Sequence, residues 1–100
     1  MLKNFRTYQL AVSFYKEGRE LKLTGAIADQ FDRASLSIVL NLAEGSSKPH
    51  KKDRLKFYHI ALASLRESQA ALDIIENPSL QNQADHLGAC LWKLIKKPGI

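Results

Sequence analysis

The sequence predicts an all-α protein, an antiparallel up-down four-helix bundle. Apolar residues recur at helical spacing in four segments, and short breaks that contain glycine, proline, serine or asparagine separate these segments. No stretch alternates apolar and polar residues as a half-buried β-strand does. Four helices with short connections pack in alternating directions, because each must return beside the one before it. The length of 100 residues, with 45% hydrophobic and 25% charged residues, indicates a single domain over residues 1–100.

The first helix is predicted to run from Asn4 or Thr7, either of which suits an N-cap, to about Leu23. Its apolar stripe is formed by Phe5, Tyr8, Val12 and Tyr15, and Ala11, Phe14 and Leu21 widen it. Gly18 lies inside this stretch, where glycine costs about 1 kcal/mol relative to alanine. We therefore expect another helix to pack closely at Gly18.

The second helix is predicted from about Ile27 to Gly45, a typical C-terminal stop. Its main stripe is formed by Ile27, Phe31, Ala34, Ile38 and Leu42. Other apolar residues cover most of its remaining surface, and such a helix must be surrounded by protein. In a chain of this size we expect an oligomer to supply part of that cover.

The third helix is the longest, from about Pro49 to Glu76. Its main stripe is formed by Leu55, Tyr58, Leu62, Leu65, Leu72 and Ile75, and a second stripe of small residues by Ala61, Ser64, Ser68 and Ala71. Small residues favour a close neighbouring helix. Asn77 suits the N-cap of the fourth helix, which ends near Lys97.

Composition restricts the class of partner. The net charge of +5 favours an acidic partner such as nucleic acid. The single cysteine, Cys90, excludes an internal disulfide and suits a reducing cytosol. The N-terminus lacks a signal-peptide pattern, and no segment approaches the roughly 20 apolar residues of a membrane span. We therefore expect a cytoplasmic protein without membrane contact, and the scattered His, Cys and Asp residues predict neither a metal nor a cofactor.

Positive charge is concentrated just after the second helix. The basic residues there are Lys48, Lys51, Lys52, Arg54 and Lys56, opposed by the acidic Asp53. Lysines in the first turn of a helix oppose its macrodipole, and a bound phosphate would satisfy both the lysines and the backbone N–H groups. The alternative is an ordinary solvated loop and helix start. In an up-down bundle, further basic residues should lie at the same end; these are Lys3, Arg6, Lys93, Lys96 and Lys97.

A polar row crosses the otherwise apolar second helix. Ser37, Asn41 and Glu44 follow one another at i, i+4 and i+7, so they share a face. Arg33 lies one turn earlier, and Glu67 of the third helix can approach. We predict a structural hydrogen-bonded network in which Arg33 pairs with a carboxylate, because buried charges need partners. The alternative is a small polar binding site, but no nucleophile or general base accompanies it.

Three runs of the sequence are similar to a known family: DQFDRASLSIVLNLAEGSSK, KFYHIALASLRESQAAL and HLGACLWKLIKK. They resemble the four-helix-bundle family of proteins encoded in intervening sequences of large-subunit ribosomal RNA genes. The family pattern falls on Arg33, Ala34, Ser37, Ile38, Asn41, Ala43, Glu44 and Gly45 and, less strictly spaced, on Ser64 and Glu67. The resemblance implies a left-handed bundle that assembles as a homopentamer. Related accessory proteins of diversity-generating retroelements associate with a reverse transcriptase and its RNA, so the resemblance also implies RNA, a reverse transcriptase or another nucleoprotein as partner.

A shorter resemblance predicts a different class of function. Arg54 and His59 have the Arg-x4-His spacing that resembles the signature of helical HEPN ribonucleases, in which both residues act on RNA. Residues five apart on a helix point about 140° away from each other, which disfavours this alternative. The leading hypothesis is a non-enzymatic homo-oligomer, a pentamer, whose basic end binds RNA or a nucleoprotein. The remaining alternative is a protein-binding or structural oligomer without nucleic-acid binding.

Overall fold

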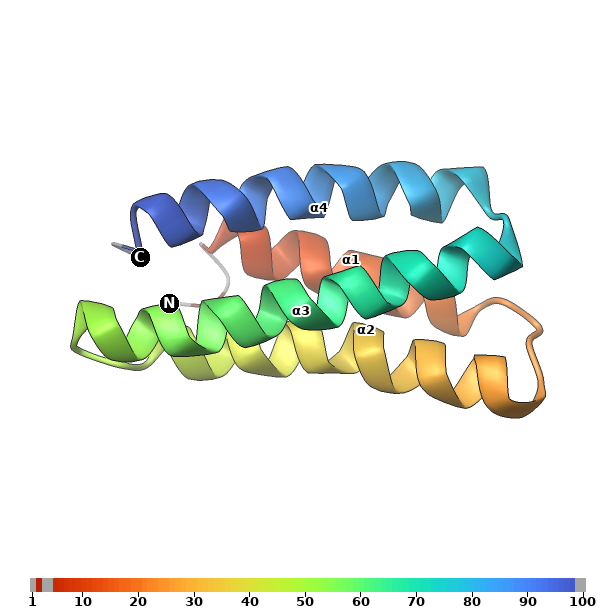
Figure 1. Cartoon of the computed structure of the whole chain (residues 1–100), viewed down its shortest axis with the longest axis horizontal. Helices are drawn as coiled ribbons and strands as arrows, with labels where there is room; N and C mark the ends of the chain where they lie inside the picture. The colour runs from red at the N-terminus through yellow and green to blue at the C-terminus, as the bar shows by residue number, and fades with distance from the viewer. Residues whose placement is uncertain (1, 3–4, 99–100) are drawn as a thin grey trace.

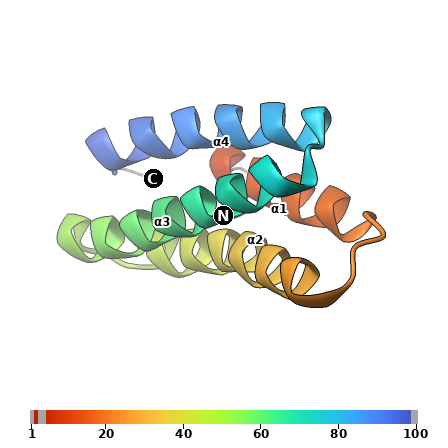
Figure 2. The ribbon, with the colours of Figure 1, turned by 45° about the vertical axis from the view of Figure 1, so that its right-hand side comes forward.

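Four α-helices make up the computed structural model of the protein, which describes residue 2 and residues 5–98. In chain order they are α1 (Arg6–Arg19), α2 (Gly25–Ser46), α3 (Lys51–Ile75) and α4 (Pro78–Lys96). Neighbouring helices run in opposite directions along a body of 40 × 21 × 21 Å (Figure 1). α1 and α3 each pack against both α2 and α4 (Figure 2). The described residues thus confirm the predicted four-helix fold, whereas the left-handed twist stays a prediction.

The core runs along the middle of the bundle and takes side chains from all four helices. Its largest fully buried apolar residues are Phe14, Ile38, Leu42, Tyr58, Leu65, Leu72, Leu80, Leu87 and Leu91. Burying one such side chain contributes about 1.5–3 kcal/mol relative to leaving it exposed. The small residues of α3, namely Ala61, Ser64, Ser68 and Ala71, are buried as well. The predicted stripes therefore meet in one core.

Several helix boundaries differ from the prediction. α1 begins at Arg6 with Phe5 in the N-cap position, whereas Thr7 lies inside the helix. The other predicted cap, Asn4, lies outside the described residues. α1 ends at Arg19 rather than near Leu23, because the last turn gives way to an extended connection whose leucines still pack on the core.

The N-cap of α4 is the one that the sequence predicts. Oδ1 of Asn77 accepts a hydrogen bond from the backbone N–H of Leu80 at 2.9 Å. Pro78 occupies the first turn, where a missing N–H leaves no helical hydrogen bond unmade. The break between α3 and α4 is therefore encoded locally, in two adjacent residues.

Two glycines lie where helices approach each other closely. At Gly18 an added Cβ would meet Cε2 of Phe31 at 2.7 Å, which confirms the close packing expected there. At Gly45 an added Cβ would meet Cε1 of Tyr58 at 2.7 Å. The prediction that Gly45 ends the second helix is wrong, because α2 continues to Ser46 and Gly45 is buried against α3. Its role is to let α2 and α3 pack together.

Among the described residues, four large apolar side chains remain exposed on the outside of the bundle. The exposed fractions are 58% for Leu40, 39% for Ile60, 73% for Ile74 and 49% for Trp92. The expectation that protein surrounds α2 on nearly every side is therefore not met within one chain, because Leu40 faces solvent. Among the described residues no helix is both long and apolar enough to cross a bilayer.

Candidate nucleic-acid interface

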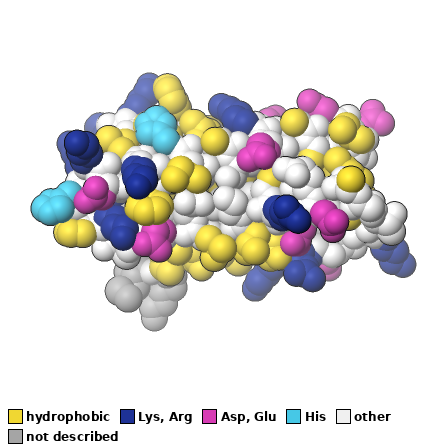
Figure 3. Space-filling model, turned by 60° about the horizontal axis from the view of Figure 1, so that its bottom comes forward, with side chains coloured by type: hydrophobic (Ala, Val, Ile, Leu, Met, Phe, Trp, Pro, Cys, Tyr) yellow, Lys and Arg dark blue, Asp and Glu magenta, His cyan; other side chains and the backbone are white. Residues whose placement is uncertain are grey.

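Basic residues gather at the end of the bundle where α1 and α3 begin and α2 and α4 finish. We count the two turns of each helix that lie nearest this end, together with Lys48 and Lys97 just beyond them. These segments carry nine basic and two acidic residues among those described. The basic residues are Arg6, Lys48, Lys51, Lys52, Arg54, Lys56, Lys93, Lys96 and Lys97. We call them the basic end, and Lys3 lies outside the described residues. Figure 3 shows Lys, Arg and His side chains crowded at the left-hand end of the molecule.

The rest of the described chain has the opposite charge. It carries five basic and eight acidic residues, a net charge of −3. The net charge of the basic end is +7. Figure 1 shows the starts of α1 and α3 and the end of α4 at the same end of the bundle, as the sequence predicts. The alternating helix directions bring them together. The structure therefore separates charge along the long axis of the bundle.

The start of α3 presents two exposed lysines of the basic end in a single helical turn. Lys51 and Lys52 are exposed in the first turn, and the N-cap residue His50 makes no side-chain hydrogen bond to the helix. Asp53 is the acidic residue of this turn. The first N–H groups of a helix have no partner within the helix, and together with nearby lysines they can bind phosphate.

Lys48 is already engaged with its neighbours. Its Nζ lies 3.0 Å from Oε2 of Glu44, one turn earlier, and 5.3 Å from the centre of the Phe57 ring. Nζ of Lys56 lies 5.7 Å from the centre of the same ring. Because Glu44 offsets part of its charge, Lys48 offers less to a phosphate than Lys51 or Lys52 does.

Arg54 is half buried and donates its hydrogen bonds to backbone carbonyl groups. Its Nε donates to the carbonyl oxygen of Pro98 at 2.6 Å, and its Nη1 donates to those of Lys48 at 2.8 Å and Pro49 at 3.0 Å. The guanidinium also acts on Tyr58, whose pKa is raised by burial and lowered, to a smaller extent, by the charge of Arg54. Arg54 thus faces inward, unlike the lysines around it.

The predicted polar row divides into a small network and separate surface contacts. Nδ2 of Asn41 donates to the carbonyl oxygen of Ser37 at 2.9 Å and to its Oγ at 3.1 Å. Oγ of Ser37 lies 2.8 Å from Oγ of Ser64, so this network joins α2 to α3. The structure does not bring Arg33, Glu44 and Glu67 into it.

Those three charged residues are exposed, and the premise that Arg33 is buried was wrong. Arg33 makes no hydrogen bond or ion pair with any other described residue, while Glu44 pairs with Lys48. Oε2 of Glu67 accepts a hydrogen bond from Gln30 at 3.2 Å. The sequence pattern placed Arg33 on the same face as Ser37, but a long side chain at the edge of that face reaches water instead.

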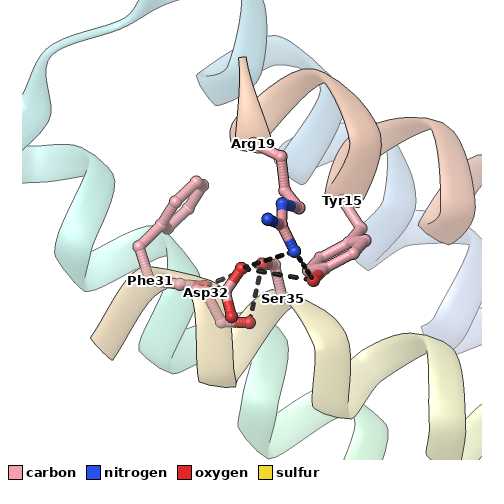
Figure 4. A network of polar contacts seen from close by, with 5 residues as sticks. All are labelled: Tyr15, Arg19, Phe31, Asp32 and Ser35. Atoms are coloured by element: carbon pink, nitrogen blue, oxygen red, sulfur yellow. Dashed lines mark hydrogen bonds and ion pairs between the residues drawn. The ribbon is translucent and has the colours of Figure 1, made fainter. Parts of the chain in front are cut away.

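A second polar cluster joins α1 to α2 near the opposite end (Figure 4). The hydroxyl of Tyr15 donates to Oδ1 of Asp32 at 3.2 Å and accepts from Nη1 of Arg19 at 3.1 Å. This hydrogen bond from Arg19 to Tyr15, with the nearby charge of Asp32, raises the pKa of Arg19 above its usual range. Arg19 and Asp32 are largely solvated and 4.0 Å apart, so their ion pair adds little stability. The i, i+4 spacing of Tyr15 and Arg19 is the sequence signal for this contact.

The two residues of the ribonuclease alternative, Arg54 and His59, lie in different environments. His59 is exposed on α3, while Nε and Nη1 of Arg54 donate to the three carbonyl groups described above. Within residues 5–98 no three His, Cys, Asp or Glu side chains are grouped so that they could hold a metal ion. Cys90 is half buried, and its Sγ lies 3.9 Å from Nε2 of His86.

Comparison with known families assigns most of the chain to one protein family. The model of a family described as 23S rRNA-intervening sequence protein matches residues 4–91. The match includes the basic residues from Lys48 to Lys56, whereas Lys93, Lys96 and Lys97 lie beyond it. Searches of curated proteins and of solved structures found no match. The matched residues cover well over half of the chain, and they include all of the Arg33 to Gly45 pattern; the chain therefore belongs to the family of 23S rRNA-intervening sequence proteins.

Proposed function

We propose that this protein is a non-enzymatic homo-oligomer, a pentamer, that binds RNA by contacts between its basic end and phosphate groups. The observation that carries the proposal is the separation of charge along the bundle, with nine basic and two acidic residues at one end of the described chain. Phosphate contacts supply most of the sequence-independent affinity of nucleic-acid-binding proteins. Base stacking is less favoured, because Phe57 and Tyr58 are half buried and buried, respectively.

The two ends of the bundle act on a ligand independently. Salt screens exposed charges beyond about 8 Å at physiological ionic strength, and the bundle is 40 Å long. A phosphate near α3 therefore experiences mainly the basic residues close to it rather than the overall net charge of +5. The eight acidic residues elsewhere do not cancel this attraction.

Exposed apolar side chains support the self-association that this proposal includes. Leu40 and Ile74 are more than half exposed on α2 and α3, and such residues favour contact with other copies of the chain. A cyclic oligomer repeats the basic end once in every protomer, so an RNA that touches several copies binds more tightly than one copy could hold it. A reverse transcriptase or another nucleoprotein is the protein partner that this function would serve.

A fluorescence anisotropy titration tests the proposal directly. We expect a fluorescein-labelled RNA stem-loop to bind at low salt and to bind less tightly as the salt concentration rises. The double variant Lys51→Glu/Lys52→Glu should abolish most of the binding. Acidic residues are favourable in the first turn of a helix, so this variant removes positive charge without weakening α3.

The matched control makes the same change of charge outside the basic end. Lys16→Glu/Lys22→Glu replaces two exposed lysines near the opposite end of α1, and its RNA affinity should stay close to that of the wild type. Absence of RNA binding at low salt, or equal losses in the two double variants, would favour a structural or protein-binding oligomer. Cleavage of the RNA by the wild type, lost in His59→Ala, would instead support the ribonuclease alternative.

A further inference from the structure

We propose that Arg54 is a positioning residue of the basic end, whose Nε and Nη1 hold the backbone next to Lys48 and Lys97 in one arrangement instead of binding phosphate. This inference rests on the proposed RNA binding and deepens it. It also revises the sequence-based prediction that Arg54 is one of the phosphate ligands.

One guanidinium group links three points of the chain. Its acceptors are the carbonyl groups of Lys48 and Pro49 in the α2–α3 connection and that of Pro98 beyond α4. Pro98 is 44 residues away from Arg54 in the sequence and is buried. The backbone leaves the helical conformation at Lys97, with φ −137° and ψ 81°, and the chain passes on to the carbonyl group that Arg54 binds.

Each acceptor lies beside a lysine of the basic end. Pro49 is two residues before Lys51, and Pro98 directly follows Lys97. Two lysine groups that are far apart in the sequence are therefore fastened to the same side chain. Without this link, the connection and the C-terminal segment would have to be ordered when RNA binds, and that ordering would reduce the affinity.

The chemistry of the acceptors separates positioning from contact. Carbonyl groups are neutral, so Arg54 keeps its full positive charge and still strengthens the local potential. Its Nε and Nη1 hydrogen bonds would have to break before those groups could reach a phosphate. Lysine cannot replace this geometry, because a single ammonium on a flexible stem lacks the planar set of donors that reaches several acceptors at once.

The substitution Arg54→Lys tests the proposal, because it keeps the charge and removes the link. We expect its affinity for the fluorescein-labelled RNA stem-loop to fall about five- to tenfold, the loss typical of one or two side chains or loops that must be ordered on binding. The matched control Arg66→Lys makes the same exchange at an exposed residue of α3 outside the basic end, and it should bind within about twofold of the wild type. A wild-type affinity in Arg54→Lys would overturn the contribution to RNA binding.

Hydrogen–deuterium exchange without RNA tests the link by itself. The backbone N–H groups of Lys48 and Lys97 are hydrogen bonded to Gly45 and Lys93, so they have protection to lose. In Arg54→Lys we expect faster exchange in the peptides that contain residues 46–50 and 94–98, and no change in a peptide from the middle of α1. Unchanged exchange in both peptides would overturn the positioning role. A wild type that binds no RNA would overturn the proposed function, and the exchange result would then decide alone whether Arg54 fastens the two segments.

Discussion

Gly45→Ala is the sharpest test of how α2 and α3 pack. The added Cβ would lie 2.7 Å and 3.0 Å from two ring carbons of Tyr58 and 3.1 Å from Cβ of Phe57. Tyr58 is fully buried, so its ring has no space to move into. Cβ of Phe57 is fixed to the backbone of α3, so relief requires the two helices to move apart.

Two opposing effects set the magnitude. Alanine is favoured over glycine inside a helix by about 1 kcal/mol, and overpacking a tight core costs about 1–3 kcal/mol. With contacts as close as 2.7 Å to a buried ring, we expect the cost near the upper limit of that range. The net loss of stability should be about 1–2 kcal/mol, which lowers the melting temperature of a domain of this size by roughly 4–15 °C.

Gly88→Ala is the matched control. An added Cβ at Gly88 would meet Cδ2 of the buried Leu65 at 3.3 Å, which requires a shift of only a few tenths of an ångström, and Nη1 of the exposed Arg66 at 3.7 Å, an ordinary contact. This variant should be as stable as the wild type or up to about 1 kcal/mol more stable. Thermal unfolding followed by circular dichroism measures both variants, at one protein concentration because self-association shifts the transition. A Gly45→Ala variant as stable as Gly88→Ala would refute the packing argument.

Three further predictions concern a cap, an outer surface and a buried phenol. Asn77→Ala removes the side-chain acceptor for the N–H of Leu80 and should lower the free energy of unfolding by about 1 kcal/mol in urea titrations; an unchanged midpoint would show that the cap adds nothing. Leu40→Lys places a charge on a residue that is 58% exposed, so it should leave the fold intact and weaken self-association in sedimentation velocity, whereas an unchanged oligomer would place the interface elsewhere. Burial raises the pKa of Tyr58 above its ordinary value of 10.0, so the neutral phenol stabilises the fold below that pH and this contribution is lost as the pH rises through the higher pKa of the folded state. Unfolding measured between neutral and strongly alkaline pH should therefore depend less on pH in Tyr58→Phe, and parallel curves for the two proteins would contradict the assignment.

Most of the helical framework was predictable because its signals are local. Asn77 and Pro78 specify a helix start by themselves, and the apolar stripes recur at a period that only a helix satisfies. The gathering of basic residues at one end was predictable too, since alternating helix directions bring together the start of α3 and the finish of α4. The family was recognisable from the Arg33 to Gly45 pattern because that pattern is a continuous run of sequence. The family match confirms it.

The roles of individual residues depended on neighbours that are distant in sequence. The sequence alone predicts that Gly45 ends a helix. The structure shows that Tyr58 of the next helix packs against it. Arg33 reads as part of a polar row until its position at the edge of the bundle exposes it. Side-chain environment is a property of the assembled helices, and spacing along one helix does not report it.

The sequence by itself determined four helices, their connections and the end at which positive charge collects, because periodicity, caps and chain direction act over a few residues. Only the tertiary structure decided which of those charges face solvent. Lys51 and Lys52 remain exposed, while Arg54 turns toward the carbonyl group of Pro98, 44 residues away. That contact exists because the finish of α4 returns beside the start of α3, where a planar guanidinium can donate to several carbonyl groups at once.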